Sequence, residues 1–444
     1  MVIAMKRVLL PLCLSLSLFA TYGCTLQAAS ADESVPVSQF ESQVTASLAL
    51  EASQAGVDAD RFAFESVRAR SGPELFATNT VGPERYIALQ VNGPGPYYLD
   101  QGVGVRLPLL GTSAEQRAEA IAADLQRRVA MYDYQLLQNQ MVAKVRQNYV
   151  AYLKARTTEQ TARGLLEELQ SEKAASGALQ RNGFWTQADD LRYSGLLSRA
   201  TSDEALAEAQ QREALEELGL LTGATVAPFE PLRPEYDTCS PSADFAISSS
   251  YKSDPELQKL LAQEDAINAL VPLQKVMGID ASLSLSVHGY YSFSGAAGAG
   301  GLMTFDVGAP IRTGQFHRDE SQRLSAELHQ TQLLIESRRH ELQTNITVAF
   351  DGRVDAQTML AQARVDHTTI AEDLRETQVR FANVTPNAMS DVQQKLKLAY
   401  EAQLALIDDD AAVLQATGQI LQYAPNACTG VSAMNEHNVG ANKP

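Results

Sequence analysis

The amino-acid sequence predicts a mainly α-helical chain with a small β part, built from two copies of one unit. Two similar segments recur in the same order, and a long glycine-poor stretch of helix-forming residues follows each of them. Short runs in which apolar and polar residues alternate lie just ahead of each stretch. In each unit, therefore, a β-hairpin is expected to lead into a long helical hairpin.

The repeat is marked by two segments that contain a proline. VGVRLPLLGTSAEQR, with Pro108, resembles FDVGAPIRTGQFHR, with Pro310, and Leu or Ile follows the proline in each. The separation along the chain from Pro108 to Asp189 is identical to the separation from Pro310 to Asp391. Equal spacing over two long segments indicates two structural units of one design.

Each long stretch is predicted to be one helix of about 65 residues, roughly 100 Å in length. Such a helix needs parallel neighbours, as in a coiled coil. The chain is expected to turn at RNGFWTQADD and again at FANVTPNAMSD. A second helix then returns, ending near Leu221 in the first unit and near Tyr423 in the second.

The alternating runs predict four β-strands. ASLSLSVHGYYSF places Leu283, Leu285 and Val287 on one face and serines and a histidine on the other, and LMTFDVGAP alternates similarly. The earlier pair is weaker, with strands over 87–91 and 99–107 around an NGPGP turn. A soluble sandwich would fit this alternation. The polar faces would also suit a wet lumen, and because four strands cannot close a barrel, a trimer would supply 12.

Composition excludes several classes of function. The net charge of −17 argues against a nucleic-acid partner, because no basic surface is available to neutralise phosphates. The six histidines show no ligand spacing, so neither a metal nor another cofactor is expected. The sequence also shows no nucleophile–base arrangement and no phosphate loop, so it does not predict an enzyme.

The N-terminus reads as a signal peptide over 1–24, with an apolar run too short to span a bilayer. It ends in TYGC, which makes Cys24 a candidate for lipidation; the alternative is ordinary cleavage near Ala29 or Ala31. No other apolar run approaches the length of a spanning helix, so any membrane crossing must use β-strands in a closed barrel. Export leaves Cys239 and Cys428 either as a disulfide candidate or as two unrelated thiols.

In the order and spacing of these features, the chain resembles the TolC-like outer-membrane factor family. SDPELQKLLAQEDAI adds a further match, similar to the Asn-Pro-x-Leu opening of a repeat in that family, with Asp254 in place of Asn. The resemblance runs from about residue 38 to 424. It divides the chain into a first repeat at 38–223, a linker at 224–250, a second repeat at 251–424 and a polar tail at 425–444.

The resemblance implies a homotrimer with a 12-stranded transmembrane β-barrel in outer-membrane lipid and an α-barrel of coiled-coil hairpins in the periplasm. It implies a passive exit duct for efflux or type I secretion, whose partners are a periplasmic adaptor protein and an inner-membrane pump. The linker and the C-terminal tail would meet in a belt around the tunnel, which brings Cys239 and Cys428 into one region. The alternative is a periplasmic structural or adaptor protein without a pore.

The resemblance also assigns roles to the two turns, as tips where the adaptor docks and the tunnel narrows. Phe184 and Trp185 would be exposed apolar anchors, unless they merely pack the turn. The implied docking residues are Asn182, Gly183, Phe184, Trp185 and Thr186 in the first tip and Asn383, Val384 and Thr385 in the second.

Four residues near the tips are implied as entrance or gate residues. Asp391, and less directly Asp189, would place carboxylates around the entrance, where a ring of three attracts cations. The alternative for each aspartate is a helix cap. Phe381 lacks the hydroxyl of the family's tyrosine, and Gln394 stands where a second entrance aspartate is usual. The closed entrance is therefore expected to be held less tightly, and its ring of charge is expected to be smaller.

Overall fold

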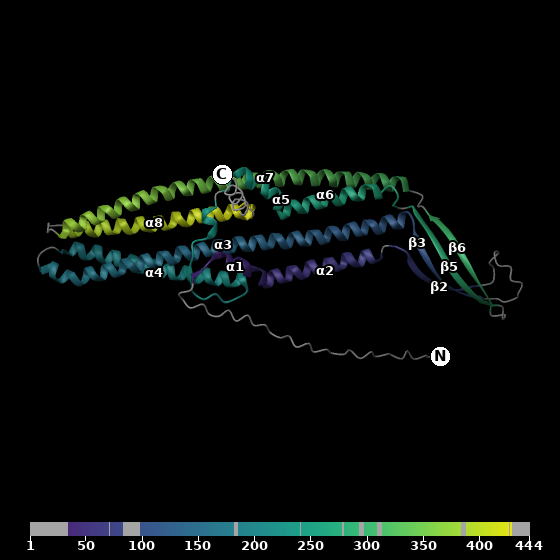
Figure 1. The fold of residues 1–444 in the computed structure, drawn as a ribbon, viewed down its shortest axis with the longest axis horizontal. Coiled ribbons are helices and arrows are strands. Elements are labelled where there is room, and N and C mark those ends of the chain that lie inside the picture. The colour runs from purple at the N-terminus through teal and green to yellow at the C-terminus, as the bar shows by residue number, and fades with distance from the viewer. Residues whose placement is uncertain are drawn as a thin grey trace, which may run out of the picture.

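The computed structural model is an elongated molecule in which long helices run side by side and a sheet lies at one end (Figure 1). The predicted fold class, mainly helical with long hairpins and four strands, is confirmed for the single chain. The signal peptide and Cys24 lie outside the described residues. These are 34–70, 72–82, 98–181, 185–239, 241–277, 279–292, 297–308, 313–382, 388–425 and 427–428.

The two helical hairpins have nearly equal dimensions. In the first, α3 (Gly111–Arg181) has 71 residues and α4 (Gln187–Thr222) has 36. In the second, α7 (Thr313–Ala382) has 70 residues and α8 (Ala388–Tyr423) has 36. The long helices slightly exceed the predicted length, and both returning helices end within one residue of the predicted positions.

Local sequence signals fix several of these helix ends. Thr186 and Asp189 form a reciprocal capping box at the start of α4, and Gly223 ends α4 in the left-handed conformation with φ 72°. Asp254 caps α6 (Pro255–Leu273), and the proline takes the first helical position, where its missing N–H has no cost.

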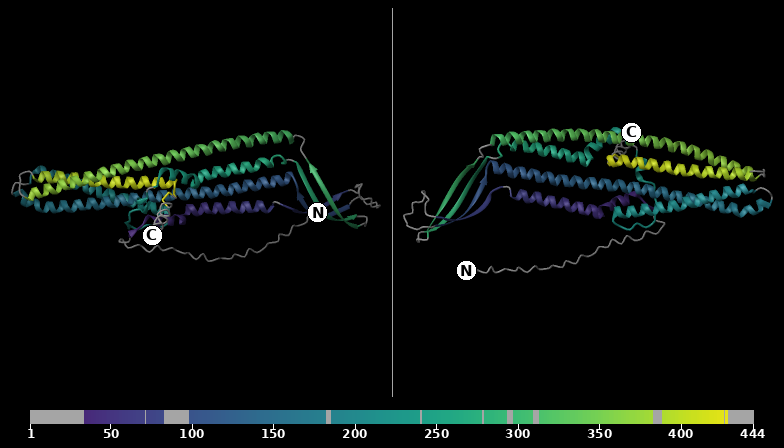
Figure 2. Two further views of the ribbon diagram at one scale, coloured as in Figure 1. Left: turned by 45° about the horizontal axis from the view of Figure 1, so that its top comes forward. Right: turned by 180° about the vertical axis from the view of Figure 1, so that it is seen from behind.

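Shorter helices complete the half of the molecule next to the sheet. There α2 lies against α3, and α6 lies against both α3 and α7 (Figures 1 and 2). In the other half, α4 and α8 take their places, so α3 and α7 run the full length. No helix among the described residues is both long and apolar enough to cross a membrane. The remaining helices are α1 (Val37–Gln43), η1 (Val44–Ala46), α2 (Leu48–Arg70), η2 (Glu235–Thr238) and α5 (Ala243–Ser253).

The sheet is antiparallel throughout, with strand order β2-β3-β5-β6. Its strands are β2 (Glu74–Gly82), β3 (Tyr98–Pro108), β5 (Asp280–Ser292) and β6 (Ala297–Gly308). The sequence did not predict β2, because Leu75 and Val81 are its only large aliphatic residues on the alternating face and Asn79 interrupts them. The strand predicted over 87–91 lies outside the described residues.

The main core forms a belt midway along the helices, where the linker crosses them. Tyr152 stacks on Phe229 with ring centroids 4.6 Å apart, and Phe40 and Tyr149 complete the aromatic cluster. Two short strands, β1 (Ser34–Val35) and β4 (Glu230–Pro231), pair in parallel beside it. The stretch expected as a linker, 224–250, contains β4, η2 and the first turns of α5.

The structure joins Cys239 of this belt to Cys428 by a disulfide, with the Cα atoms 5.6 Å apart. The sequence alone left this pairing open. The belt therefore links the first unit, the linker and the end of α8.

Candidate entrance site and membrane-facing sheet

The first tip buries its tryptophan. Trp185 is 5% exposed and packs with Tyr193 and with leucines of α3 and α4. Its indole N–H donates to Asp190 Oδ1 at 2.9 Å, so the polar edge is also satisfied. The prediction that Trp185 is an exposed anchor is therefore wrong, because the hairpin itself covers the ring and the indole packs the turn. Asn182, Gly183 and Phe184 lie outside the described residues.

A cationic side chain completes this cluster. The Lys173 ammonium lies 3.0 Å from Asp190 Oδ1 and sits over the rings of Trp185 and Tyr193, 5.7 and 5.1 Å from their centroids. The hydrogen bond from Lys173 holds the pKa of Asp190 below its ordinary value, and the bond from Trp185 adds to this effect. The first tip is thus held together by contacts within its own hairpin.

Asp189 belongs to the helix cap. Its Oδ2 accepts the backbone N–H of Thr186 at 2.8 Å and the Thr186 hydroxyl at 2.6 Å, and the residue is 3% exposed. A carboxylate buried in this way cannot present its charge to a lumen in this conformation. The geometry is the capping alternative that the sequence left open, and it argues against Asp189 as an entrance residue.

The second tip presents two of its predicted residues to solvent. Asp391 lies in the first turn of α8, and both Asp391 and Gln394 are exposed. Phe381 lies in the last turn of α7, with its side chain outside the described part. Asn383, Val384 and Thr385 are also outside it. Among the three predicted gate residues whose side chains the structure describes, Asp391 and Gln394 are thus exposed and Asp189 is buried.

Polar bonds connect the two hairpins near the tips. The Tyr400 hydroxyl of α8 donates to Asp203 Oδ2 of α4 at 2.9 Å, and Arg199 of α4 pairs with Glu401 of α8. Closer to the tip, Arg192 Nη1 donates to Ser390 Oγ at 2.6 Å. We call Arg199, Asp203, Tyr400 and Glu401 the latch.

The environment of Tyr400 favours its neutral form. The residue is 4% exposed, and burial raises the pKa of its phenol, with a further contribution from the carboxylate of Asp203. The neutral hydroxyl can therefore donate to Asp203 at any pH near neutrality. A buried donor of this kind is costly to leave unpaired, so the bond favours the arrangement in which α4 and α8 are adjacent.

Sequence reasoning missed the latch. Arg199 and Asp203 are one helical turn apart on α4, so they read as an ordinary pair on a solvated face, and their side chains do approach to 3.7 Å. The signal that could have found the latch is the repeat itself. Arg199 and its partner Glu401 occupy equivalent positions in the two repeats, because they lie equally far past the equivalent aspartates Asp189 and Asp391.

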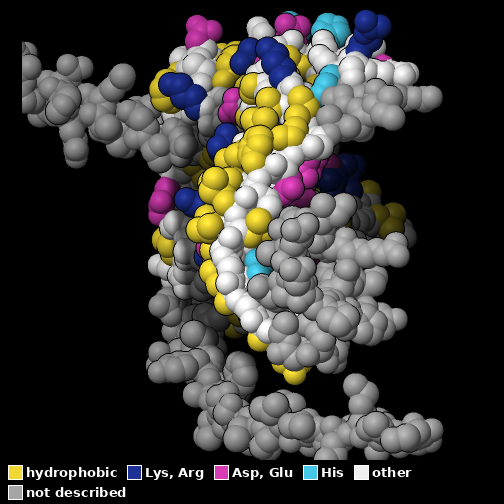
Figure 3. Space-filling model, turned by 90° about the vertical axis from the view of Figure 1, so that its right-hand side faces the viewer, with side chains coloured by type: hydrophobic (Ala, Val, Ile, Leu, Met, Phe, Trp, Pro, Cys, Tyr) yellow, Lys and Arg dark blue, Asp and Glu magenta, His cyan; other side chains and the backbone are white. Residues whose placement is uncertain are grey.

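The sheet exposes its apolar face. Met303, Phe305 and Val287 are 72, 63 and 62% exposed, and Figure 3 shows hydrophobic side chains in a continuous band along the strands. The alternate residues behave oppositely, since Ser284 and Ser286 are only 6 and 4% exposed. A sheet in water buries its apolar face. This one has the reverse polarity.

The polar face carries a hydrogen-bonded group across β3 and β5. His288 lies with Nδ1 3.1 Å from Asp100 Oδ1 and with Nε2 2.6 Å from Ser286 Oγ. Gly102 on β3 makes room for the ring, because a Cβ there would lie 2.6 Å from His288. The polar side chains thus bond to one another across the strands.

The chain is similar to known proteins in its three-dimensional structure. The chain matches no protein-family model, and a search of curated protein sequences also returns no match. The fold is similar to that of CusC, whose crystal structures concern the conformational changes that accompany folding and transmembrane channel formation. The TM-score is 0.71, with 13% identity over 89% of this chain and 93% of that one.

Two further solved structures have a similar fold. The open state of the Neisseria gonorrhoeae MtrE outer membrane channel gives a TM-score of 0.69, with 14% identity over 87% of this chain and 88% of that one. The Vibrio cholerae outer membrane protein VceC gives 0.67, with 11% identity over 87% of this chain and 95% of that one. The chain therefore has the fold of TolC-like outer-membrane channels, as its sequence pattern predicts. At these identities the likeness establishes the fold.

Proposed function

We propose that the chain is one subunit of an outer-membrane exit duct, through which a tripartite efflux or type I secretion system passes its substrates. The duct is passive, because its driving force would come from a partner pump. The proposed partners are two further copies of the chain, a periplasmic adaptor that docks at the tips, an inner-membrane pump and outer-membrane lipid. Cys24 is proposed as an additional lipid anchor.

The observation that carries this proposal is the reversed polarity of the sheet. An apolar band that stays exposed on an isolated chain is costly in water, at about 25 cal/mol per Å², and favourable against lipid tails. The strands have 9, 11, 13 and 12 residues, which suits tilted strands that cross a bilayer. A soluble sandwich would need a second layer over this face, and the described part of the chain supplies none.

The edges of the sheet support a trimer. Among the described residues, β2 and β6 each pair with a strand on one side only, so each presents backbone groups that no described strand pairs. Strand direction alternates across the four strands, so β6 of one copy would meet β2 of the next in antiparallel pairing. Three copies give 12 strands, which is enough to close a barrel.

The entrance is proposed at the tips. Three copies of the exposed Asp391 would form a carboxylate ring, which attracts cations and repels anions. The latch joins α4 to α8 and would hold the narrow state. Opening would then require that the second hairpin separate from the first.

Planar-bilayer conductance of the extracted protein tests both the duct and the carboxylate ring at its entrance. The Asp391→Asn variant is compared with Asp244→Asn, which removes another exposed carboxylate, from the belt. Stepwise cation-preferring currents that lose selectivity only in Asp391→Asn are expected. Unchanged selectivity would retain the duct and overturn the entrance assignment. A folded trimer that forms no pores would favour the poreless periplasmic alternative.

A further inference from the structure

The disulfide of the belt closes the second unit into a covalent ring. Cys239 lies in the linker and Cys428 follows α8, 189 residues later. The ring therefore contains α5, β5, β6 and the whole second hairpin. Loop closure of this length strongly restricts the chain, whatever the local packing.

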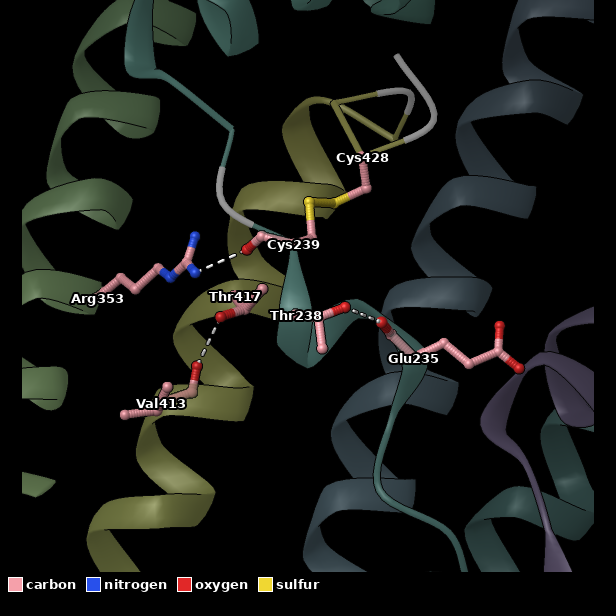
Figure 4. Close-up of a disulfide and its surroundings, with 7 residues drawn as sticks. All are labelled: Glu235, Thr238, Cys239, Arg353, Val413, Thr417 and Cys428. Carbon is pink, nitrogen blue, oxygen red and sulfur yellow. Dashed lines mark hydrogen bonds between the residues drawn. A yellow bond between two sulfur atoms is a disulfide. The ribbon is translucent and has the colours of Figure 1, made fainter. Parts of the chain in front are cut away.

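The linker that carries Cys239 is also held by both helices of that hairpin. Arg353 of α7 donates from Nη2 to the Cys239 carbonyl oxygen at 2.7 Å, beside the disulfide (Figure 4). The Arg233 guanidinium of the linker makes two 2.9 Å bonds to the Asp410 carboxylate of α8. The linker thus contacts α7 and α8 at the same time.

The described residues after α8 are 424, 425, 427 and 428, and they make few other contacts. Ala424 and Ala427 are fully buried against the belt core, and the Ala427 N–H bonds to the Ala424 carbonyl oxygen. Two alanine side chains bury little apolar surface, since each contributes a single methyl group. Among the described residues after α8, the covalent bond at Cys428 is therefore the strongest attachment.

The helix α8 is consequently held on both its tip side and its belt side. Tyr400 and Glu401 of the latch bind α4 on the tip side, and Asp410 and Cys428 bind the linker on the belt side. A helix of 36 residues is a rod of about 54 Å. A shift of the rod at the belt therefore moves the latch residues relative to α4.

We propose that the Cys239–Cys428 disulfide is an oxidation-dependent clasp that sets the position of α8 and so maintains the latch. In the oxidised protein α8 is held in the register at which Tyr400 reaches Asp203. In the reduced protein the end of α8 keeps only its noncovalent contacts with the belt, and the latch opens more often. The consequence for conduction rests on the proposed duct, whereas the clasp itself does not.

Formation of the clasp is a two-electron oxidation. The two cysteine thiols lose two protons and two electrons as the S–S bond forms. A dithiol–disulfide oxidase of the exported compartment accepts them, and its own disulfide becomes a dithiol. Both cysteines are partly exposed in the chain, so such a partner can reach them.

Hydrogen exchange on the full-length extracted protein tests the clasp. Oxidised protein is compared with protein that has been reduced and alkylated, and with the double variant Cys239→Ser/Cys428→Ser. Amide exchange is expected to rise about tenfold at 420–424 and severalfold at 396–404, beside the latch. The double variant should already show both increases and should not respond to reductant, which controls for other effects of the reagent.

Three results would overturn the proposal. These are unchanged exchange, an increase confined to 420–424, and two freely alkylated thiols in protein extracted without reductant. Amide hydrogen exchange can be measured whether or not the protein forms pores. Absence of current would therefore contradict the proposed duct and leave the clasp to be decided by exchange. Where currents occur, reduction should raise the open probability severalfold.

Discussion

The bond between Tyr400 and Asp203 allows a quantitative test of the latch. Tyr400→Phe keeps the buried ring and removes only the hydroxyl that donates to Asp203 Oδ2 at 2.9 Å. A hydrogen bond to a charged acceptor contributes about 1.5–3 kcal/mol. The Asp203 side chain is 27% exposed and approaches Arg199 at 3.7 Å, so water and the guanidinium partly replace the lost donor. The lower end of the range, about 1.5 kcal/mol, is therefore expected.

This energy translates into an effect on gating. Because the bond needs α4 and α8 to be adjacent, its loss shifts the closed-to-open equilibrium by about tenfold, which corresponds to about 1.4 kcal/mol. Single-channel recordings should show the shift in dwell times. A double-mutant cycle with Asp203→Ala should return a coupling energy of about 1.5 kcal/mol.

The matched control is Tyr193→Phe. Tyr193 is buried in the same cluster, and its hydroxyl makes no hydrogen bond to any other described residue. Its removal should leave dwell times unchanged. The latch is refuted if both tyrosine variants behave alike, or if the coupling energy falls below about 0.5 kcal/mol.

Three further predictions concern stability and order. Burial raises the pKa of the Tyr236 phenol, so above about pH 10 the unfolded chain loses this proton before the folded chain does, and the folded state becomes less stable as the pH rises. The melting temperature of Tyr236→Phe should therefore fall less steeply with rising pH than that of the unmodified protein. Asp254→Ala should cost about 2–3 kcal/mol by thermal unfolding, because it removes a helix cap and the partner of half-buried Arg338, whereas Asp254→Asn should retain the cap. Emission from Trp185 should shift to longer wavelength in Asp190→Ala.

Much of the fold was predictable because it depends on local and repeated signals. Equal spacing from Pro108 to Asp189 and from Pro310 to Asp391 located both hairpins, and alternation located β3, β5 and β6. The strand β2 was missed because one alternating set of residues in ELFATNTVG holds only two large aliphatic residues, separated by Ala and Asn. A strand stabilised by its neighbour rather than by its own pattern gives little local signal.

The details of the site were less predictable. Whether Trp185 faces solvent depends on Leu165 and Leu169 of α3, which meet it only after the chain has turned. The latch depends on the register between helices of different repeats, a quantity that no single helix encodes. The sequence therefore located the two turns, and it left open whether Trp185 is exposed at the tip or packs the turn, as the structure shows.

The reversed sheet polarity gives the sharpest test of the membrane assignment. Met303 and Thr304 are adjacent on β6 and point to opposite faces, with Met303 72% exposed. Lysine on a lipid-facing position costs about 2–4 kcal/mol near the bilayer centre, whereas lysine on the lumen side has access to water. Met303→Lys should therefore block insertion into vesicles while Thr304→Lys, beside Asp306, is tolerated.

In a trimer the penalty applies three times, which makes the contrast between the two variants large. A soluble protein with the same sheet would tolerate Met303→Lys at least as well as Thr304→Lys, because a lysine at an exposed position costs little in water. Equal insertion of both variants would remove the basis for the duct. The comparison depends only on which face meets lipid, so it holds whichever substrate the duct carries.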